Sequence, residues 1–194
     1  MGAEGSVMMM WQQQILNYTP FNEQEQQDLQ SFKAAMLQLE DVLTRGNTLA
    51  HFTCSGFVVN RARTKVLMVY HHIYDSWSWT GGHVDGETNF LQVAMREVLE
   101  ETGVMAKPIA EEIFAIDLLT VIGHVKKGVY VSPHLHLNVT YLLEADDTVA
   151  TVIAEEENSA VDWLPIDQLE SYCNEKHMLP VYEKIIQKIQ RNDY

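Results

Sequence analysis

The sequence predicts an α/β sandwich, in which helices cover the faces of a mixed β-sheet. Strand-like apolar runs alternate along the chain with segments that have helical apolar periodicity. No internal repeat or low-complexity linker interrupts this alternation. The length of 194 residues suits one domain at 48–194 preceded by a helical extension at 1–47.

The predicted extension contains one clear helical segment. Residues 1 to about 20 are rich in Met and Gln and show no period. Residues 22–43 are predicted to form a helix with one apolar stripe, composed of Phe32, Met36, Leu39 and Leu43. Gly46 and Asn47 are predicted to end this helix. Such an amphipathic extension would pack on the domain or contribute to a homodimer.

Strand and helix signals follow one another through the rest of the chain. In order, we expect strands at 57–60 and 66–70, a helix at 89–102 that ends at Gly103, strands at 113–122 and 134–143, a short helix begun by a capping box of Asp167 and Glu170, and a terminal helix at 181–189 with Ile185, Ile186 and Ile189 on one face.

Composition restricts the partners that the protein can bind. Acidic residues outnumber basic residues 27 to 13, which gives a net charge of -14. This charge disfavours nucleic acids and anionic membranes and favours a divalent cation. The two cysteines, Cys54 and Cys173, lie far apart and indicate no disulfide framework. With no apolar run of membrane-spanning length and no secretory signal, we expect a cytoplasmic protein.

The helix at 89–102 carries the strongest chemical pattern. At about 100° per residue, its apolar stripe consists of Leu91, Ala94, Met95 and Val98. Three carboxylates, those of Glu97, Glu100 and Glu101, lie together on another face. They repel one another unless a cation joins them, and Mg²⁺ prefers such hard oxygen ligands. The alternative is a solvated acidic face.

A known motif surrounds these acids. Residues 81–104 read GGHVDGETNFLQVAMREVLEETGV. This segment resembles the box of the Nudix (MutT-like) hydrolases, G-x5-E-x7-R-E-U-x-E-E-x-G-U with U aliphatic. Counted from Gly82, the matching positions are Arg96, Glu97, Val98, Glu100, Glu101, Gly103 and Val104. The first motif glutamate falls on Thr88, so the neighbouring Glu87 is the candidate for its role.

The resemblance extends over roughly residues 50–190 and implies both a fold and a reaction. The fold would be an α/β/α sandwich with mixed sheets. With Mg²⁺ or Mn²⁺ bound, water would attack a phosphorus of a small molecule that contains a nucleoside diphosphate linked to another group. The implied metal ligands are Glu97, Glu100, Glu101 and the Gly81 carbonyl. Arg96 would orient Glu97.

The identity of the general base stays open at this point. The resemblance allows Glu97 itself, or a glutamate from a loop near Trp163. Glu157 is the loop candidate, and Glu155 and Glu156 compete with it. The alternative for Glu157 is that it belongs to a solvated acidic loop.

Three side chains are candidates for substrate binding. His134 and His136 alternate on a predicted strand and therefore share one face, where they would contact substrate phosphate or metal or would simply form a polar face. Trp77 could stack on a base. His83, inside the box loop, has no partner at metal-ligand spacing in the sequence. Cys54 is predicted to be buried.

Two other functions compete with hydrolysis. A non-catalytic Nudix-like nucleotide sensor is suggested by Thr88, although the other box residues argue against it. An enzyme that resembles isopentenyl diphosphate isomerase would share the fold, but Cys54 lacks the expected Cys- and His-rich surroundings. A DNA-binding regulator would need a basic helical module, which this chain does not supply.

Overall fold

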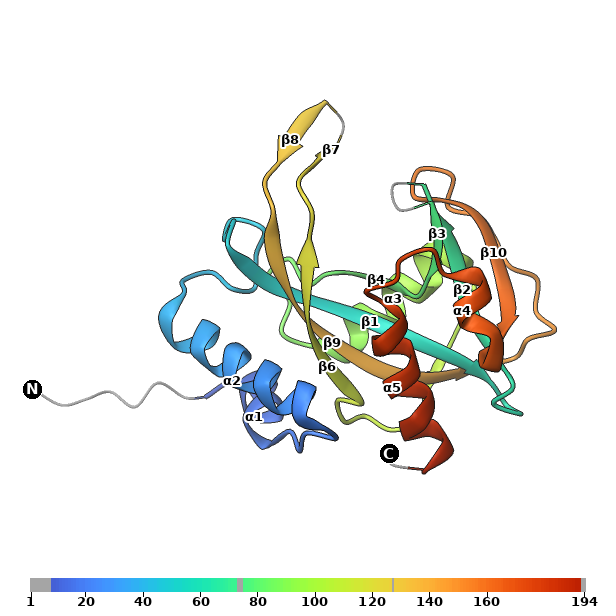
Figure 1. Ribbon diagram of the computed structural model, residues 1–194, viewed down its shortest axis with the longest axis horizontal. Helices are drawn as coiled ribbons and strands as arrows, with labels where there is room; N and C mark the ends of the chain where they lie inside the picture. The colour runs from blue at the N-terminus through green and yellow to red at the C-terminus, as the bar shows by residue number, and fades with distance from the viewer. Residues whose placement is uncertain (1–7, 73–74, 127, 193–194) are drawn as a thin grey trace, which may run out of the picture.

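The computed structural model describes residues 8–72, 75–126 and 128–192 (Figure 1). The helices are α1 (Met10–Asn17), α2 (Glu23–Gln38), α3 (Phe90–Thr102), α4 (Leu169–Tyr172) and α5 (Leu179–Gln190), with a 3₁₀ turn at Ile166–Gln168. The strands are β1 (Ala50–Asn60), β2 (Lys65–His71), β3 (Ser76–Ser78), β4 (Thr80–His83), β5 (Lys107–Pro108), β6 (Ala115–Val121), β7 (His124–Lys126), β8 (Val129–Val131), β9 (His134–Ala145) and β10 (Asn158–Pro165).

The main sheet is mixed, as the sequence predicts. Its order is β10-β2-β1-β9-β5, and β3, β4 and β6 pair with β2, β1 and β9 respectively. The long central strand β1 runs parallel to β9 and antiparallel to β2 and β4. In the parallel register, His51 lies opposite His136 and Cys54 lies opposite Val139. Two strands distant in sequence therefore form the centre of the molecule.

Alternate residues of β1 face two different cores. Phe52, Cys54 and Val58 belong to the core that contains α3, whereas Phe57 and Val59 belong to the core that contains α5. This alternation follows from the two-residue period of a strand. Helices therefore cover both faces of the sheet, and the predicted α/β/α sandwich is confirmed. Cys54 is fully buried, as expected.

Gly56 brings α3 close to β1. A Cβ atom at Gly56 would lie 2.6 Å from Cγ2 of Val98 and 3.0 Å from Cδ1 of Leu143. Only glycine leaves room for this contact between helix and sheet. The contact fixes the distance of the acidic helix from the strand beneath it.

The extension packs on the domain. Trp11, Ile15, Leu29 and Phe32 are buried in the same core as Phe52. Trp11 and Phe52 meet edge to face, with ring centroids 5.2 Å apart. Residues 1–7 of the predicted extension lie outside the described residues. Residues 10–17 show no apolar period in the sequence, so α1 was not predicted.

The second helix is shorter than predicted. It ends at Gln38 rather than at residue 43, because Leu39 is extended (φ -108, ψ 139). The chain then turns toward β1, where the backbone N–H of Phe52 donates to the Val42 carbonyl at 2.8 Å. Leu43, Gly46 and Asn47 therefore lie in the connection, so the predicted helix end was wrong.

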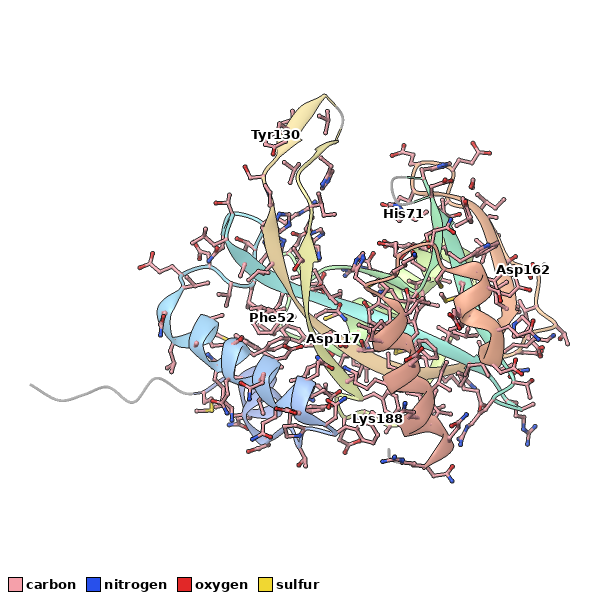
Figure 2. All side chains as sticks on the ribbon, in the orientation of Figure 1. Phe52, His71, Asp117, Tyr130, Asp162 and Lys188 are labelled. Atoms are coloured by element: carbon pink, nitrogen blue, oxygen red, sulfur yellow. The ribbon has the colours of Figure 1, made fainter. Side chains whose placement is uncertain are left out.

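One further expectation needs correction, and one further element was missed. Asp167 lies inside the 3₁₀ turn, and α4 begins after Gln168 without a side-chain cap, so Asp167 and Glu170 form no capping box. The β7–β8 hairpin was missed, and it projects beyond the sheet with Tyr130 65% exposed (Figure 2). Within the described residues, no helix is both long and apolar enough to span a membrane.

Candidate active site on the acidic helix

The acidic helix α3 is fixed at both ends. The Asn89 side chain accepts a hydrogen bond from the N–H of Gln92, which caps the first turn. Gly103 ends the helix in the left-handed conformation, with φ at 71°. Both boundaries agree with the sequence to within a residue. Ala94 and Val98 of the predicted stripe are fully buried, and Leu91 and Met95 are partly buried against the same core.

The three box carboxylates lie at different depths. Glu101 is 5% exposed and accepts a hydrogen bond from the backbone N–H of Gly81 at 2.8 Å. Glu97 is partly buried against Gly82, where a Cβ atom would collide with its carboxylate. Glu100 is the most open, with 61% of its side chain exposed. The exposure of the acids thus decreases from Glu100 at the surface to Glu101 beside the Gly81 backbone.

Burial makes the two inner acids hard to ionise. Loss of water raises the pKa of Glu101 to about 8, against the opposing hydrogen bond from Gly81. Loss of water also raises the pKa of Glu97, and the charge of Glu100 adds to it. Glu157 raises the pKa of both inner acids. Carboxylates that repel one another in a partly dry site are suited to a divalent cation.

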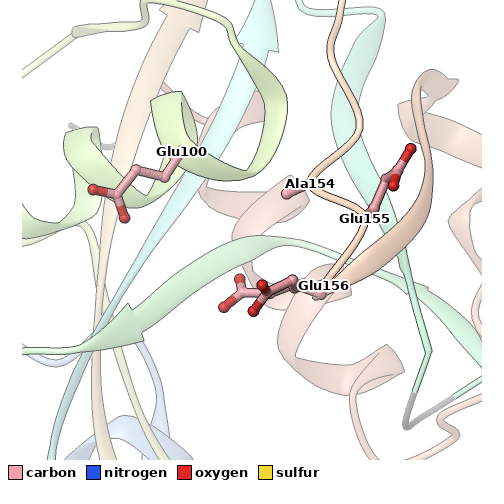
Figure 3. Close-up of a pocket in the computed structure, with 5 residues that line it drawn as sticks. Glu100, Ala154, Glu155 and Glu156 are labelled. Carbon is pink, nitrogen blue, oxygen red and sulfur yellow. The ribbon is translucent and has the colours of Figure 1, made fainter.

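The loop at 154–157 faces the exposed end of this cluster. Glu100 and the loop residues Ala154, Glu155, Glu156 and Glu157 line a cavity of about 230 Å³ (Figure 3). Glu155 points away from the side chains of Glu100 and Glu156, and its carbonyl lies 3.3 Å from Nε2 of His72. Of the three competing loop acids, Glu157 is the one whose charge acts on both Glu97 and Glu101.

Two contacts tie this loop to the end of α3. The N–H of Val152 donates to the Thr102 carbonyl at 2.8 Å, and the Asn158 side-chain amide donates to the Glu101 carbonyl at 3.1 Å. A Cβ atom at Gly103 would lie 2.9 Å from Cγ2 of Val152. Glu157 is therefore positioned by the terminus of the acidic helix itself.

Arg96 connects the box loop to the acids. Its guanidinium forms an ion pair with Glu87 and lies 3.6 Å from Glu97 and 3.7 Å from Glu100. The closest partner is thus Glu87 rather than Glu97, which the resemblance implied. Thr88 is exposed. Arg96 therefore links Glu87, which is one residue away from the motif position, to Glu97 and Glu100.

Trp77 has protein partners on the second core. Its ring meets Tyr70 edge to face at 5.5 Å, and it packs against the core beneath α5. Its carbonyl accepts a hydrogen bond from the thiol of Cys173. Stacking of Trp77 on a substrate base stays a prediction.

His134 and His136 belong to a larger cluster. Their Nε2 atoms lie 3.2 Å apart, and His51 and His83 lie beside them. The expectation that His83 has no partner at metal-ligand spacing was wrong, because the β1–β4 pairing brings it to His51 and His136. His51 was missed because no motif contains it, and the parallel β1–β9 register that places it is not visible in the sequence.

A family model for the NUDIX domain matches residues 51–188. The chain belongs to the Nudix family. Members of this family generally hydrolyse pyrophosphate linkages in nucleoside diphosphate derivatives and use divalent metals, and this Nudix protein is a hydrolase. The carboxylate oxygens at α3 are the donor type that such an ion requires.

Solved structures share the fold at low sequence identity. A NUDIX-family hydrolase from Clostridium perfringens aligns with a TM-score of 0.52 and 20% identity, over 72% of this chain and 97% of that chain. The NUDIX domain of Shewanella oneidensis NrtR, complexed with ADP ribose, aligns with a TM-score of 0.52 and 17% identity, over 81% of this chain and 97% of that chain.

A third solved structure, a binary complex of a C. elegans Ap4A hydrolase, aligns with a TM-score of 0.50 and 16% identity, over 72% of this chain and 97% of that chain. No curated protein matches the sequence. The Nudix fold of the chain is therefore supported by both the family model and the solved structures.

Proposed function

We propose that this Nudix hydrolase cleaves a diphosphate linkage in a small nucleoside-diphosphate-type substrate, with Mg²⁺ as cofactor, in the cytoplasm. The observation that carries the proposal is the convergence of Glu97 and Glu101 beside Gly81 and Gly82, where the charge of Glu157 acts on both acids. The relatives complexed with ADP ribose and acting on Ap4A support the substrate class, since both molecules contain phosphate anhydrides linked to nucleosides.

The cation would be held by Glu97, Glu100 and Glu101, with the Gly81 carbonyl as a further oxygen ligand. Bound there, Mg²⁺ would neutralise charge on the phosphate oxygens and lower the pKa of an attacking water. The acidic loop at 154–157 would otherwise repel a polyphosphate, so cation binding and substrate binding are expected to depend on each other.

Each side chain has a proposed task. Glu97 takes the proton of the attacking water, and Glu157 is the alternative base from the opposite side of the site. Arg96 lies between Glu87, Glu97 and Glu100 and restrains them through charge-assisted contacts. The Gly81 N–H fixes one oxygen of Glu101, which leaves the other oxygen for the cation. Trp77 remains a proposed substrate contact, and His134 and His136 remain proposed contacts to substrate phosphate or to a metal ion.

The substitution Glu101→Gln tests the metal assignment. Glutamine keeps an oxygen that accepts from Gly81 but loses the charge, so the fold should persist while turnover falls by orders of magnitude. Turnover is measured with Mg²⁺ on dinucleotides, nucleotide sugars and nucleoside triphosphates. Glu155→Gln is the comparison variant, because this loop acid points away from Glu100 and Glu156, and it should lower turnover far less than Glu101→Gln does. A folded Glu101→Gln protein with near-normal turnover would contradict the assignment.

The same assay separates the competing functions. A nucleotide sensor would bind a member of the substrate panel tightly and release no product. An isomerase-like reaction that uses Cys54 is disfavoured by burial, which raises the pKa of this thiol well above its usual value. Hydrolysis is therefore the function that the site supports best.

A further inference from the structure

Four of the eight histidines lie together on the sheet. His51 and His136 form the centre, with ring centroids 5.0 Å apart. The centroid of His83 is 5.0 Å from each of these two rings, and that of His134 is 4.9 Å from His51 and 5.0 Å from His136. The chain thus gathers imidazoles from β1, β4 and β9 at one place.

Strand pairing accounts for this cluster. In the parallel β1–β9 register, His51 lies opposite His136, and β4 places His83 opposite Thr53, two residues further along β1. His134 and His136 share a face because they are two residues apart on β9. The arrangement is built from regular sheet structure, so the rings are held on rigid elements.

Backbone carbonyls select the tautomers of two of the rings. Nδ1 of His51 lies 2.9 Å from the Asn47 carbonyl, and Nδ1 of His134 lies 2.8 Å from the Ser132 carbonyl. A carbonyl oxygen can only accept, so each Nδ1 carries the proton and each Nε2 presents a lone pair. In metal sites, a carbonyl that accepts a hydrogen bond from one ring nitrogen orients the other nitrogen toward the metal.

A buried ring nitrogen without a hydrogen-bond partner lies in this cluster. His51 is 4% exposed, and among the described residues its buried Nε2 has no hydrogen-bond partner. A buried polar atom without a hydrogen-bond partner destabilises the folded protein. The lone pair of His51 Nε2 requires a donor or a metal ion to remove this destabilisation.

The nitrogen spacing suits a metal. One ring nitrogen from each of His51, His83 and His136 can be chosen so that all lie within 4.8 Å of one another. Tetrahedral zinc with Zn–N distances of about 2.0–2.1 Å places its ligand nitrogens roughly 3.3 Å apart. Nε2 of His134 and Nε2 of His136 lie 3.2 Å apart, which is a hydrogen-bond distance between the two rings and is also close to the ligand spacing at zinc.

We propose that His51, His83 and His136, with His134 as a fourth ligand, form a binding site for a divalent transition-metal ion of the zinc class. This site is separate in donor type from the acids of α3, because imidazole nitrogen selects Zn²⁺ and similar ions whereas carboxylate oxygen selects Mg²⁺. The bound ion would join strands β1, β4 and β9 beside the proposed active site.

Binding of a phosphate by the same rings is less well supported. Anion binding would need several protonated imidazoles, and their charges would repel one another because the ring centroids of His51 and His136 lie only 5.0 Å apart. A neutral imidazole donates a lone pair to a metal and offers no net charge to an anion.

Zinc binding to the full chain tests the proposal. The metal-free protein is titrated with Zn²⁺ alone against a chromophoric chelator, and bound zinc is examined by X-ray absorption for imidazole scattering. We expect one tightly bound Zn²⁺ per chain, a rise in melting temperature, and retention of this site in the Glu97→Gln, Glu101→Gln double variant. His83→Gln and His136→Gln should each weaken binding by at least about tenfold.

A matched control separates this site from other histidines. His177→Gln changes an exposed histidine that contacts Glu175 and should leave zinc binding unchanged. His83 is only partly buried, so His83→Gln keeps the test valid if His136→Gln fails to fold. Wild-type zinc affinity in folded His83→Gln, or loss of the tight site only when Glu97 and Glu101 are changed, would overturn the proposal. Either result leaves hydrolysis at α3 to be judged by its own assay.

Discussion

Glu101 is buried at a position that disfavours the charged form of its carboxyl group. Its carboxyl group is buried against the Gly81 N–H, with Glu97, Glu100 and Glu157 around it. The box motif and helical geometry predict that this acid belongs to the site. They do not predict its depth, because depth depends on how closely Gly56 lets α3 approach β1.

The raised pKa of Glu101 predicts that the stability of the metal-free protein depends on pH. Burial raises the folded-state pKa of Glu101 from its usual value of 4.5 to about 8, so the folded state binds more protons than the unfolded state between these pH values. The free energy of unfolding should therefore fall as pH rises from about 5 to about 8. Urea denaturation with a chelator present should show this fall, and Glu101→Gln should flatten it. Mg²⁺ should oppose the fall, and an identical slope in the variant would contradict the assignment.

A second prediction at the residue scale concerns whether Glu87 takes the role of the motif glutamate. The motif position is Thr88, yet Glu87 is the acid that pairs with Arg96. Glu87→Gln should lower turnover, because Arg96 loses a restraint and the site loses an acid. The ion pair is largely exposed, so the free energy of unfolding should change by less than about 1 kcal/mol. Steady-state kinetics and denaturation measure both effects, and unchanged turnover would show that Glu87 does not replace the motif glutamate.

His51 marks the limit of sequence reasoning at the residue scale. Helical neighbours can be read from spacings of three and four residues, so Glu97, Glu100 and Glu101 were placed together correctly. His51 and His136 are 85 residues apart, and only the register between two distant strands joins them. A single sequence carries no local signal for that register.

At the scale of elements, helix ends were predicted correctly where a capping residue marks them. Asn89 and Gly103 bound α3 as expected, because an N-cap and a left-handed C-terminal glycine act locally. The end of α2 was predicted wrongly, because the apolar residues after Gln38 serve the turn into β1 rather than a helix face. Tertiary contacts there override a periodic pattern.

Gly103 couples the acidic helix to the loop that carries Glu157. Gly103 has a left-handed backbone conformation. The substitution Gly103→Ala would place a methyl group there, 2.9 Å from Cγ2 of Val152. Gly128→Ala is the matched control, since Gly128 also has positive φ (80°) but open space around its Cβ position. The control should cost about 1 kcal/mol and leave turnover unchanged.

Gly103→Ala should cost more than this control and should also lower turnover, because the loop must shift away from α3. Chemical denaturation and steady-state kinetics of both variants give the comparison. Equal stability losses with full turnover in both would show that the Val152 contact does not position the loop.

At the scale of the whole molecule, a buried ion network joins the extension to the domain. Nζ of Lys184 on α5 lies 3.2 Å from Oε1 of Glu25 on α2 and 2.6 Å from Oδ1 of Asp117 on β6. The Tyr18 hydroxyl donates to Glu25 at 2.7 Å and accepts from Lys188 at 3.0 Å. The sequence predicted an amphipathic extension, but its composition gave no sign that α2 supplies a counter-charge to the terminal helix.

This network makes the stability of the domain depend on a residue outside the matched segment 51–188. Glu25→Ala would leave the ammonium groups of Lys184 and Lys188 buried with less counter-charge, since each lysine is only 4% exposed. Breaking a buried pair in this way costs about 3–5 kcal/mol. Glu23→Ala changes an exposed acid in the same helical turn and should cost less than about 1 kcal/mol.

Denaturation followed by tryptophan fluorescence and by circular dichroism checks this difference. The two probes should report one shared transition in both variants, shifted strongly only by Glu25→Ala, because α2 and the sheet share the core around Phe32 and Phe52. Equal stability of the two variants, or early loss of helix alone in Glu25→Ala, would mean that the extension is an independent unit and that the domain does not need it.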